Sequence, residues 1–230
     1  MSSTNNNRLF SSIATRYDLL NHLLSLNIDQ SWRKELIKCA GVKPGESILD
    51  VCTGTGDIAI RFARMNSCKE IVGIDWSDEM LHLARRKIMK RGLDRRIKLL
   101  NANALCLPFD DSFFDVVSIG FGLRNLTDRK KGISEMARML RKGGRMLILE
   151  FSPPADNLFG MFYNLCLNTM IPVVGGIVSG SASAYRYLST SIVSFLKPEE
   201  ITELMEQAGL KNVWFKSLTG GIAYIYKGEK

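Results

Sequence analysis

The hydrophobic pattern of the chain changes repeatedly between two periods. Short apolar runs typical of buried strands occupy 46–51, 70–75, 97–101, 114–120 and 145–151, and stretches with helical spacing lie at 57–65, 77–91 and 129–141. Parallel strands need helical crossovers between them, so this alternation predicts a mostly parallel, doubly wound α/β sheet with helices on both faces. We expect Lys142-Gly143-Gly144 to separate the last of these helices from its strand.

The two ends of the chain follow other patterns. Residues 9–40 have helical spacing, and a further helix is predicted over 198–209. After it, the runs VWFKSL and IAYIYKG flank Thr219-Gly220-Gly221, which predicts an antiparallel hairpin. Such a hairpin at the edge of a parallel sheet is unusual for a plain dinucleotide-binding fold.

One long stretch, residues 157–185, contains no charged side chain. Its core at 158–178 has the length of a membrane span. Asn164, Asn168 and Pro172 disfavour a span, as does its position between elements of a globular sheet. We expect residues 152–195 to form a hydrophobic cap over the active site that touches the membrane surface.

Composition narrows the class of protein. The chain has 230 residues, of which 46% are hydrophobic and 23% charged, and this composition suits a globular domain. Its formal charge of +8 favours binding to anionic surfaces such as nucleic acid or acidic lipid. The alternative is a basic enzyme whose charge has no such partner. Five cysteines without CxxC spacing predict reduced thiols, and two histidines predict no metal site. The polar N-terminus has no signal-peptide pattern, so we expect a cytoplasmic protein.

A glycine-rich turn follows the first predicted strand in the run SILDVCTGTGDIA, residues 47–59. Gly54, Gly56 and Ala59 fit the dinucleotide-binding fingerprint, and Asp75 ends the next strand, where a carboxylate can bind ribose hydroxyls. To this extent NAD fits the pattern.

The charges around this turn favour another ligand. Asp50 ends the strand and Asp57 opens the helix, where a pyrophosphate would otherwise sit. S-adenosyl-L-methionine (SAM) has no phosphate and carries a cationic sulfonium and amine, so it suits these carboxylates. The alternative is that Asp57 only caps the helix and complements its dipole. Asn103-Ala104 follow the third strand and could hydrogen-bond the edge of an adenine, and Pro108-Phe109 could pack against its ring. The alternative is that residues 103–109 form a loop without a ligand.

The motifs LDVCTGTGD, GIDWSDEML, NANALCLPFDDSFFDVV, FGLRN and RKGGRMLILEFS occur in this order. With the N-terminal stretch around Tyr17-Asp18, they make the chain resemble the C-methyltransferases of menaquinone and ubiquinone biosynthesis over about residues 8–228. The SAM motifs are shared by many methyltransferases, whereas the N-terminal signature, FGLRN and LEFS are more specific. Three positions depart from the family pattern. Asp29 and Tyr226 stand where the family usually has His, and Gly120 stands where it usually has Ser or Ala.

The resemblance implies SAM-dependent methylation of a ring carbon of a polyprenyl quinol. The implied step is demethylmenaquinol to menaquinol, with the 2-methoxy-6-polyprenyl-benzoquinol step of ubiquinone synthesis also open. It implies one domain over 1–230, with 1–40 as an N-terminal helical lid, and no nucleic-acid partner. Peripheral contact with the membrane and a homodimer stay open. The alternatives are an RNA methyltransferase, favoured by the positive charge, and a non-catalytic SAM-binding partner.

The predicted site residues fall into two groups. Those expected to bind SAM are Asp50, Gly54, Thr55, Gly56, Asp75, Trp76, Asn103, Ala104 and Gly120. Those expected to be catalytic are Tyr17, Asp18, Arg124 and Asn125. The Arg124 guanidinium would hold a developing quinolate, unless it pairs with Asp128 on the surface. Asp18 is the preferred base, unless the N-terminal helix only docks on the domain.

Overall fold

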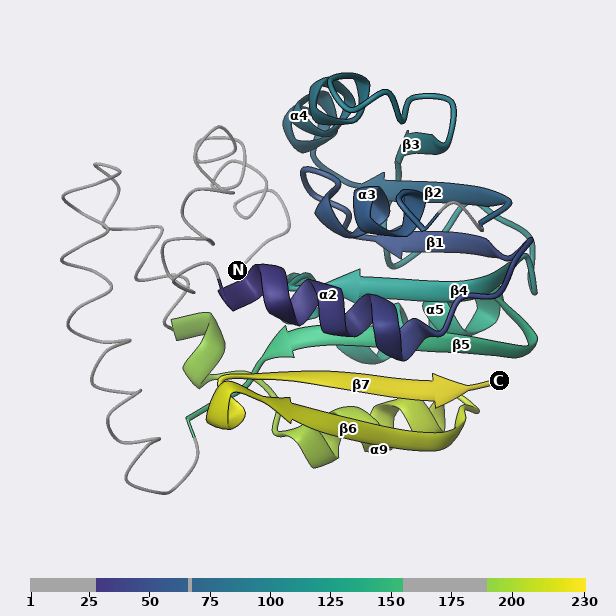
Figure 1. Cartoon of the computed structure of the whole chain (residues 1–230). Coiled ribbons are helices and arrows are strands. Elements are labelled where there is room, and N and C mark those ends of the chain that lie inside the picture. Colours follow the sequence, from purple (N-terminus) through teal and green to yellow (C-terminus); the bar gives the residue numbers. More distant parts are fainter. Residues whose placement is uncertain (1–27, 66–67, 155–189) are drawn as a thin grey trace, which may run out of the picture.

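The computed structural model describes residues 28–65, 68–154 and 190–230 (Figure 1). A seven-stranded sheet has the order β3-β2-β1-β4-β5-β7-β6. The first five strands of this order are parallel, and β7 is antiparallel to both β5 and β6. The strands are β1 Ser47–Val51, β2 Glu70–Asp75, β3 Ile97–Asn101, β4 Phe114–Gly120, β5 Leu140–Phe151, β6 Lys211–Leu218 and β7 Ala223–Glu229. The predicted doubly wound sheet with its C-terminal hairpin is confirmed.

Helices cover both faces of the sheet (Figure 1). Their bounds are α2 Ile28–Ala40, α3 Asp57–Ala63, α4 Asp78–Met89, α5 Arg129–Met139 and α9 Pro198–Gln207. Apolar side chains of α2, α3 and α4 belong to one buried cluster and those of α5 and α9 to the other. Strand β1 is buried along its whole length because both faces are covered, which explains its continuous apolar run.

The starts of the helices follow from local sequence. The Ser77 hydroxyl accepts from Met80 N at 3.3 Å to cap α4, and the Asp128 carboxylate accepts from Lys131 N at 2.9 Å to cap α5. Helix α3 instead begins after Gly56, which has a left-handed backbone (φ 84°) and no capping side chain. Asp57 is the first helical residue and so does not cap α3, but it lies in the first turn, where its charge complements the helix dipole.

The expected break at Lys142-Gly143-Gly144 is also wrong, since it lies inside β5. Gly143 has φ 77° and the pairing of β5 with β4 shifts register beside it, so the strand bulges without ending. Gly143 N donates to Lys230 O at 2.7 Å, and Lys230 N donates to Gly144 O at 2.9 Å. The last residue of the chain therefore supplies the backbone partners that keep this segment extended.

Two predicted segments lie mainly outside the described residues: the N-terminal helix before Ile28 and the charge-free stretch 157–185. Within the described ranges, no helix is both long enough and apolar enough to cross a bilayer.

The sheet order also locates the ligand crevice. The chain passes from β1 to β2 on one side and from β4 to β5 on the other, so the connections after the neighbouring strands β1 and β4 run in opposite directions. In open α/β sheets, ligands bind at the carboxyl ends of the strands at this reversal.

Candidate active site

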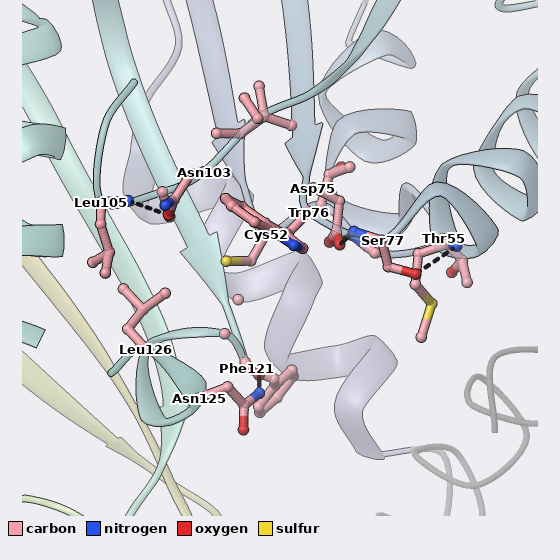
Figure 2. A pocket seen from close by; sticks show the side chains of 18 of the residues that line it. Cys52, Thr55, Asp75, Trp76, Ser77, Asn103, Leu105, Phe121, Asn125 and Leu126 are labelled. Atoms are coloured by element: carbon pink, nitrogen blue, oxygen red, sulfur yellow. Dashed lines mark hydrogen bonds between the residues drawn. The ribbon is translucent and has the colours of Figure 1, made fainter. Parts of the chain in front are cut away.

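A cavity of about 280 Å³ lies at this reversal, near the lower end of the ~300–1,000 Å³ typical of small-molecule sites. The segments around it follow β1, β2, β3 and β4, and α2 adds a residue from above the sheet. Figure 2 shows Asn103 and Leu105 on one side, Asp75, Trp76 and Ser77 on another, and Phe121 with Asn125 on a third. Its described lining residues are Arg33, Cys52, Thr53, Gly54, Thr55, Asp57, Ile74, Asp75, Trp76, Ser77, Met80, Ala102, Asn103, Ala104, Leu105, Gly120, Phe121, Gly122, Asn125, Leu126 and Thr127.

The glycine turn after β1 has the backbone that a close ligand approach requires. Gly54 and Gly56 have φ of 56° and 84°, which favour glycine. Gly54 and Thr55 line the cavity, and Thr55 is buried, with its hydroxyl accepting from Lys87 Nζ at 3.1 Å. Gly56 lies behind the lining and packs against Ala84 and Ile88 of α4, so it shapes the turn without facing the cavity.

Asp75 connects the turn to the end of β2. Its Oδ2 accepts from Gly54 N at 2.8 Å, and its Oδ1 accepts from Ser77 N at 3.0 Å. Burial raises the pKa of Asp75, and the N–H groups of Ser77, Gly54 and Trp76 oppose that shift. A carboxylate has about four acceptor positions, so these N–H groups leave room for a hydroxyl of a ligand.

The segment after β3 forms the opposite end of the cavity. Asn103 Oδ1 accepts from Leu105 N at 2.9 Å, which holds a tight turn (Figure 2). Trp76 lines the cavity from the end of β2 with 51% of its surface exposed, so it offers a flat ring to a ligand. Phe109, expected as a wall, packs edge-on against Phe114 at 5.2 Å and is absent from the described lining, and Leu105 and Leu126 supply the apolar surface there.

Of the two aspartates that suggested a cationic ligand, only Asp57 lines the cavity. Its Oδ1 lies 2.5 Å from Lys87 Nζ, so its charge is matched within the protein. Asp50 lies beneath the lining, and the hydroxyls of Thr53 and Ser118 donate to it at 2.7 and 2.8 Å. The prediction that Asp50 touches the ligand is corrected: the residue is 1% exposed, and its carboxylate organises the turn from below.

The burial of Asp50 predicts a pH dependence of stability. Burial raises the pKa of Asp50 from 3.8 to about 6, against the effect of its hydroxyl donors. The native state therefore keeps this proton to higher pH than the unfolded chain does. The contribution of Asp50 to the free energy of unfolding falls as pH rises from about 4 to about 6, by an amount on the order of 1–3 kcal/mol.

Asp50→Asn should remove this loss, since an amide can still accept from Ser118 and donate to Thr53. Urea denaturation of the unliganded protein should show the variant gaining stability relative to wild type between pH 4.5 and 7. Asp94→Asn, at an exposed position, is the matched control. A difference between Asp50→Asn and wild type that does not change with pH would contradict the shifted pKa.

The end of β4 is strained and tightly packed. Cys52 and Phe121 have φ of 54° and 57°, unusual for residues with side chains, and both line the cavity. A Cβ on Gly122 would lie 2.6 Å from the Cβ of Cys52, so this residue must be glycine. A Cβ on Gly120 would meet Ile58 Cδ1, the end of a flexible side chain, which would have to shift.

Arg124 does not lie where the sequence predicted. It is 5% exposed and is absent from the described lining. Its Nη1 lies 2.6 Å from Glu150 Oε1 and donates to Phe121 O at 2.8 Å. Neither the quinolate contact nor the surface pair with Asp128 matches this geometry, because the buried carboxylate of β5 holds the guanidinium inside the domain. Asn125, the next residue, does line the cavity.

The structure therefore brings seven of the nine predicted SAM-binding residues to one cavity, all except Asp50 and Gly56. Tyr17 and Asp18 lie outside the described residues. Sequence reasoning missed the apolar wall formed by Phe121, Leu126 and Met80, which has no polar signature. It also missed Arg33, which reaches the cavity only because α2 packs there. Among the described residues, no cluster of His, Cys, Asp and Glu could hold a metal ion.

Solved structures with similar folds include a putative SAM-dependent methyltransferase from Methanococcus maripaludis, at a TM-score of 0.70 and 18% identity, covering 96% of this chain and 93% of that one. Phosphoethanolamine N-methyltransferase 2 from Haemonchus contortus, in complex with SAM, aligns at a TM-score of 0.67 and 17% identity over 87% of this chain and 52% of that one. These likenesses show that the chain has the fold of SAM-dependent methyltransferases.

Proteins with similar sequences identify the family within the methyltransferases. The family model of the ubiE/COQ5 methyltransferase family matches residues 1–230. The demethylmenaquinone methyltransferase of Thermus thermophilus is 43% identical over 96% of this chain and 100% of its own length. The ubiquinone/menaquinone biosynthesis C-methyltransferase of Geobacter sulfurreducens is 44% identical over 96% of this chain and 87% of its own. The chain belongs to the ubiE/COQ5 methyltransferase family, and SAM is its cofactor.

Proposed function

We propose that the chain transfers the methyl group of SAM to a ring carbon of a polyprenyl quinol, converting demethylmenaquinol to menaquinol. The observation that carries this proposal is the similarity to the Thermus thermophilus demethylmenaquinone methyltransferase, which extends over that protein's whole length. The name of the Geobacter sulfurreducens relative also includes ubiquinone biosynthesis, so the 2-methoxy-6-polyprenyl-benzoquinol step is the second candidate substrate.

The proposal assigns SAM to the cavity with its ribose at Asp75 and its adenine between Trp76 and the Asn103–Leu105 turn. Supporting this orientation, the Asp75 carboxylate accepts two backbone N–H bonds that aim its remaining acceptor positions. The apolar side chains of Leu105 and Leu126 suit an adenine ring, and Asn103 and Ala104 offer polar backbone atoms beside it. The sulfonium then lies toward the ends of β1 and β4, near Cys52, Gly120 and Asn125.

In the proposed reaction, a ring carbon of the quinol attacks the methyl carbon as the methyl–sulfur bond breaks, and S-adenosylhomocysteine leaves. The ring then loses the proton on that carbon and regains aromaticity. The three atoms must be in line, so positioning supplies much of the acceleration. The ring is a stronger nucleophile when a neighbouring hydroxyl is deprotonated, and phenols titrate near pKa ~10, so a base or hydrogen-bond donor assists.

The Asn125 amide is the described polar group best placed to hydrogen-bond a quinol oxygen. Its Nδ2 lies 3.4 Å from Phe121 O, at the edge of the cavity (Figure 2). Tyr17 and Asp18 remain the proposed sources of a base, on the strength of the family signature alone. Arg124 is proposed to act indirectly, because its bond to Phe121 O and its pair with Glu150 fix the strained segment that presents Asn125.

We also propose roles for two segments that lie mainly outside the described ranges. We assign the part of 1–40 that precedes α2 as a lid, since α2 itself packs on the sheet, and 152–195 as the cap that receives the polyprenyl tail, because the cap has a long stretch without charge. Each buried methylene contributes about 0.8 kcal/mol, so one isoprene unit fully buried would contribute roughly 3–4 kcal/mol. Basic residues would hold the enzyme against an anionic bilayer while the tail stays partly in lipid.

The function is tested by transfer of a radiolabelled methyl group from SAM to demethylmenaquinol, to 2-methoxy-6-polyprenyl-benzoquinol and to bulk RNA. We expect label in the naphthoquinol, no label in RNA, and a lower KM for quinols with several isoprene units than for a quinol without a tail. Label in RNA alone would establish the RNA methyltransferase alternative. An equal KM with and without the tail would remove the proposed role of the cap.

A further inference from the structure

Arg33 is a buried cation that reaches the cavity from α2. It is 7% exposed and is the only basic residue among the described lining residues. The roles proposed for the glycine turn and for Asp75 do not explain why a cation lies at the cavity. A buried charge is costly unless it is matched, and here Asp29 Oδ2 matches only one edge of the guanidinium, at 3.2 Å from Nε.

Helix α2 holds Arg33 in a fixed position. Trp32 Nε1 donates to Thr219 Oγ1 at 2.8 Å, and the Trp32 ring packs 5.9 Å from Phe151 and 6.2 Å from Phe121. At the other end of α2, the Arg145 guanidinium donates to Ala40 O and, at 2.9 Å, to Gly41 O. Because side chains from both ends of the sheet hold the helix, the guanidinium of Arg33 does not depend on a ligand for its placement.

The guanidinium itself is only partly used. Its Nε donates to Asp29 Oδ2 at 3.2 Å, and its Cζ lies 5.2 Å from the centre of the Phe121 ring. No described residue accepts from its two terminal nitrogens. Asp29 is 1% exposed, so this pair fixes one edge of the guanidinium and leaves the outer edge for a ligand.

The charges of the lining indicate which ligand group belongs at that edge. Asp57 is matched by Lys87 at 2.5 Å, and Asp75 accepts two backbone N–H bonds at the end of β2. An anionic group in the cavity therefore finds its positive partner at Arg33. SAM carries one carboxylate, at the end of its methionyl chain, and a planar carboxylate matches the paired N–H groups of a guanidinium.

The distance between Asp75 and Arg33 also suits the length of SAM. Val51 of β1 pairs with Ile74 of β2 on one side and with Ile119 of β4 on the other. Neighbouring strands lie ~4.8 Å apart, so the ends of β2 and β4 are separated by about 10 Å. Asp75 is at the first end and Phe121, beneath Arg33, is at the second. The methionyl chain of SAM, measured from the ribose, can bridge such a distance.

We propose that Arg33 binds the carboxylate of the methionyl moiety of SAM and that Asp29 orients its guanidinium. This inference rests on the proposed placement of SAM in the cavity and adds the residue that recognises its amino-acid end. It also gives α2 a role in cofactor binding, since the helix is then one wall of the SAM site.

The test uses two ligands that share the adenosyl part. S-adenosylhomocysteine carries the carboxylate, and 5′-methylthioadenosine lacks the whole amino-acid group. By titration calorimetry, Arg33→Gln should weaken S-adenosylhomocysteine binding roughly 10- to 100-fold, the range for a lost charge-assisted hydrogen bond, and leave methylthioadenosine binding within about twofold of wild type. Lys34→Gln, an exposed neighbour on α2, should change neither.

Arg33→Gln leaves the buried Asp29 carboxylate without its partner, so the double variant Asp29→Asn/Arg33→Gln is measured in parallel. It should retain the native circular dichroism spectrum and show the same selective loss. Equal weakening of both ligands would overturn the proposal, because Arg33 would then only shape the cavity, and so would unchanged affinity for both. If wild type bound neither ligand, the proposed SAM site would be refuted. That outcome is distinct from a variant that changes the affinity for S-adenosylhomocysteine relative to the affinity for methylthioadenosine.

Discussion

Asp75→Ala is expected to weaken SAM binding by roughly 30- to 1,000-fold, equivalent to about 2–4 kcal/mol, because charge-assisted hydrogen bonds contribute roughly 1.5–3 kcal/mol each. The carboxylate accepts from Gly54 N at 2.8 Å and from Ser77 N at 3.0 Å, which aims its other acceptor positions into the cavity. The variant loses both the ribose contacts and the bond that holds the glycine turn. Titration calorimetry with SAM measures the effect.

Two further variants separate these causes. Asp75→Asn keeps an oxygen for Gly54 N but removes the charge, so its loss should be intermediate. Asp78→Asn, on the exposed first turn of α4, should bind SAM as wild type does. A folded Asp75→Ala protein whose affinity for SAM stays within twofold of wild type would show that the ribose lies elsewhere.

Arg124→Met is expected to lower the free energy of unfolding by about 3–5 kcal/mol, since removing one partner leaves the other charge buried and unmatched. The Arg124 and Glu150 side chains are 3% and 0% exposed and lie 2.6 Å apart. Glu150 also accepts from Arg124 N at 3.1 Å, so the same carboxylate holds the backbone of the strained segment. Urea denaturation measures the loss.

The double variant Arg124→Met/Glu150→Leu should recover much of this loss, because it leaves no orphan charge. The matched control is Lys98→Met, which breaks a pair of the same length, 2.6 Å, whose side chains are 77% and 26% exposed. That change should cost less than about 1 kcal/mol. If Arg124→Met kept its stability and lost only turnover with quinol, Arg124 would act on the substrate, as the sequence alone had suggested.

Local sequence was sufficient for most of the secondary structure. The strand at 97–101 has the predicted bounds, and α4 begins where Ser77 supplies a cap. Periodicity and capping involve residues only a few positions apart, so they can be read from sequence. The segment around Gly143 could not, because its strand is completed by Lys230, at the far end of the chain.

The candidate site divides in the same way. Gly54, Asp75, Asn103 and Asn125 line the cavity because each lies at or shortly after the end of a strand, and parallel strands bring their carboxyl ends together. This much was determined by the sequence, along with the family and the cofactor. The place of each charge was decided only by tertiary structure. Arg124 turns toward Glu150, Asp50 is covered by Thr53 and Ser118, and Arg33 enters the cavity with α2. A buried charge takes the partner that packing brings within hydrogen-bond distance, and for Arg124 and Asp50 a decisive partner is 26 or 68 residues away along the chain.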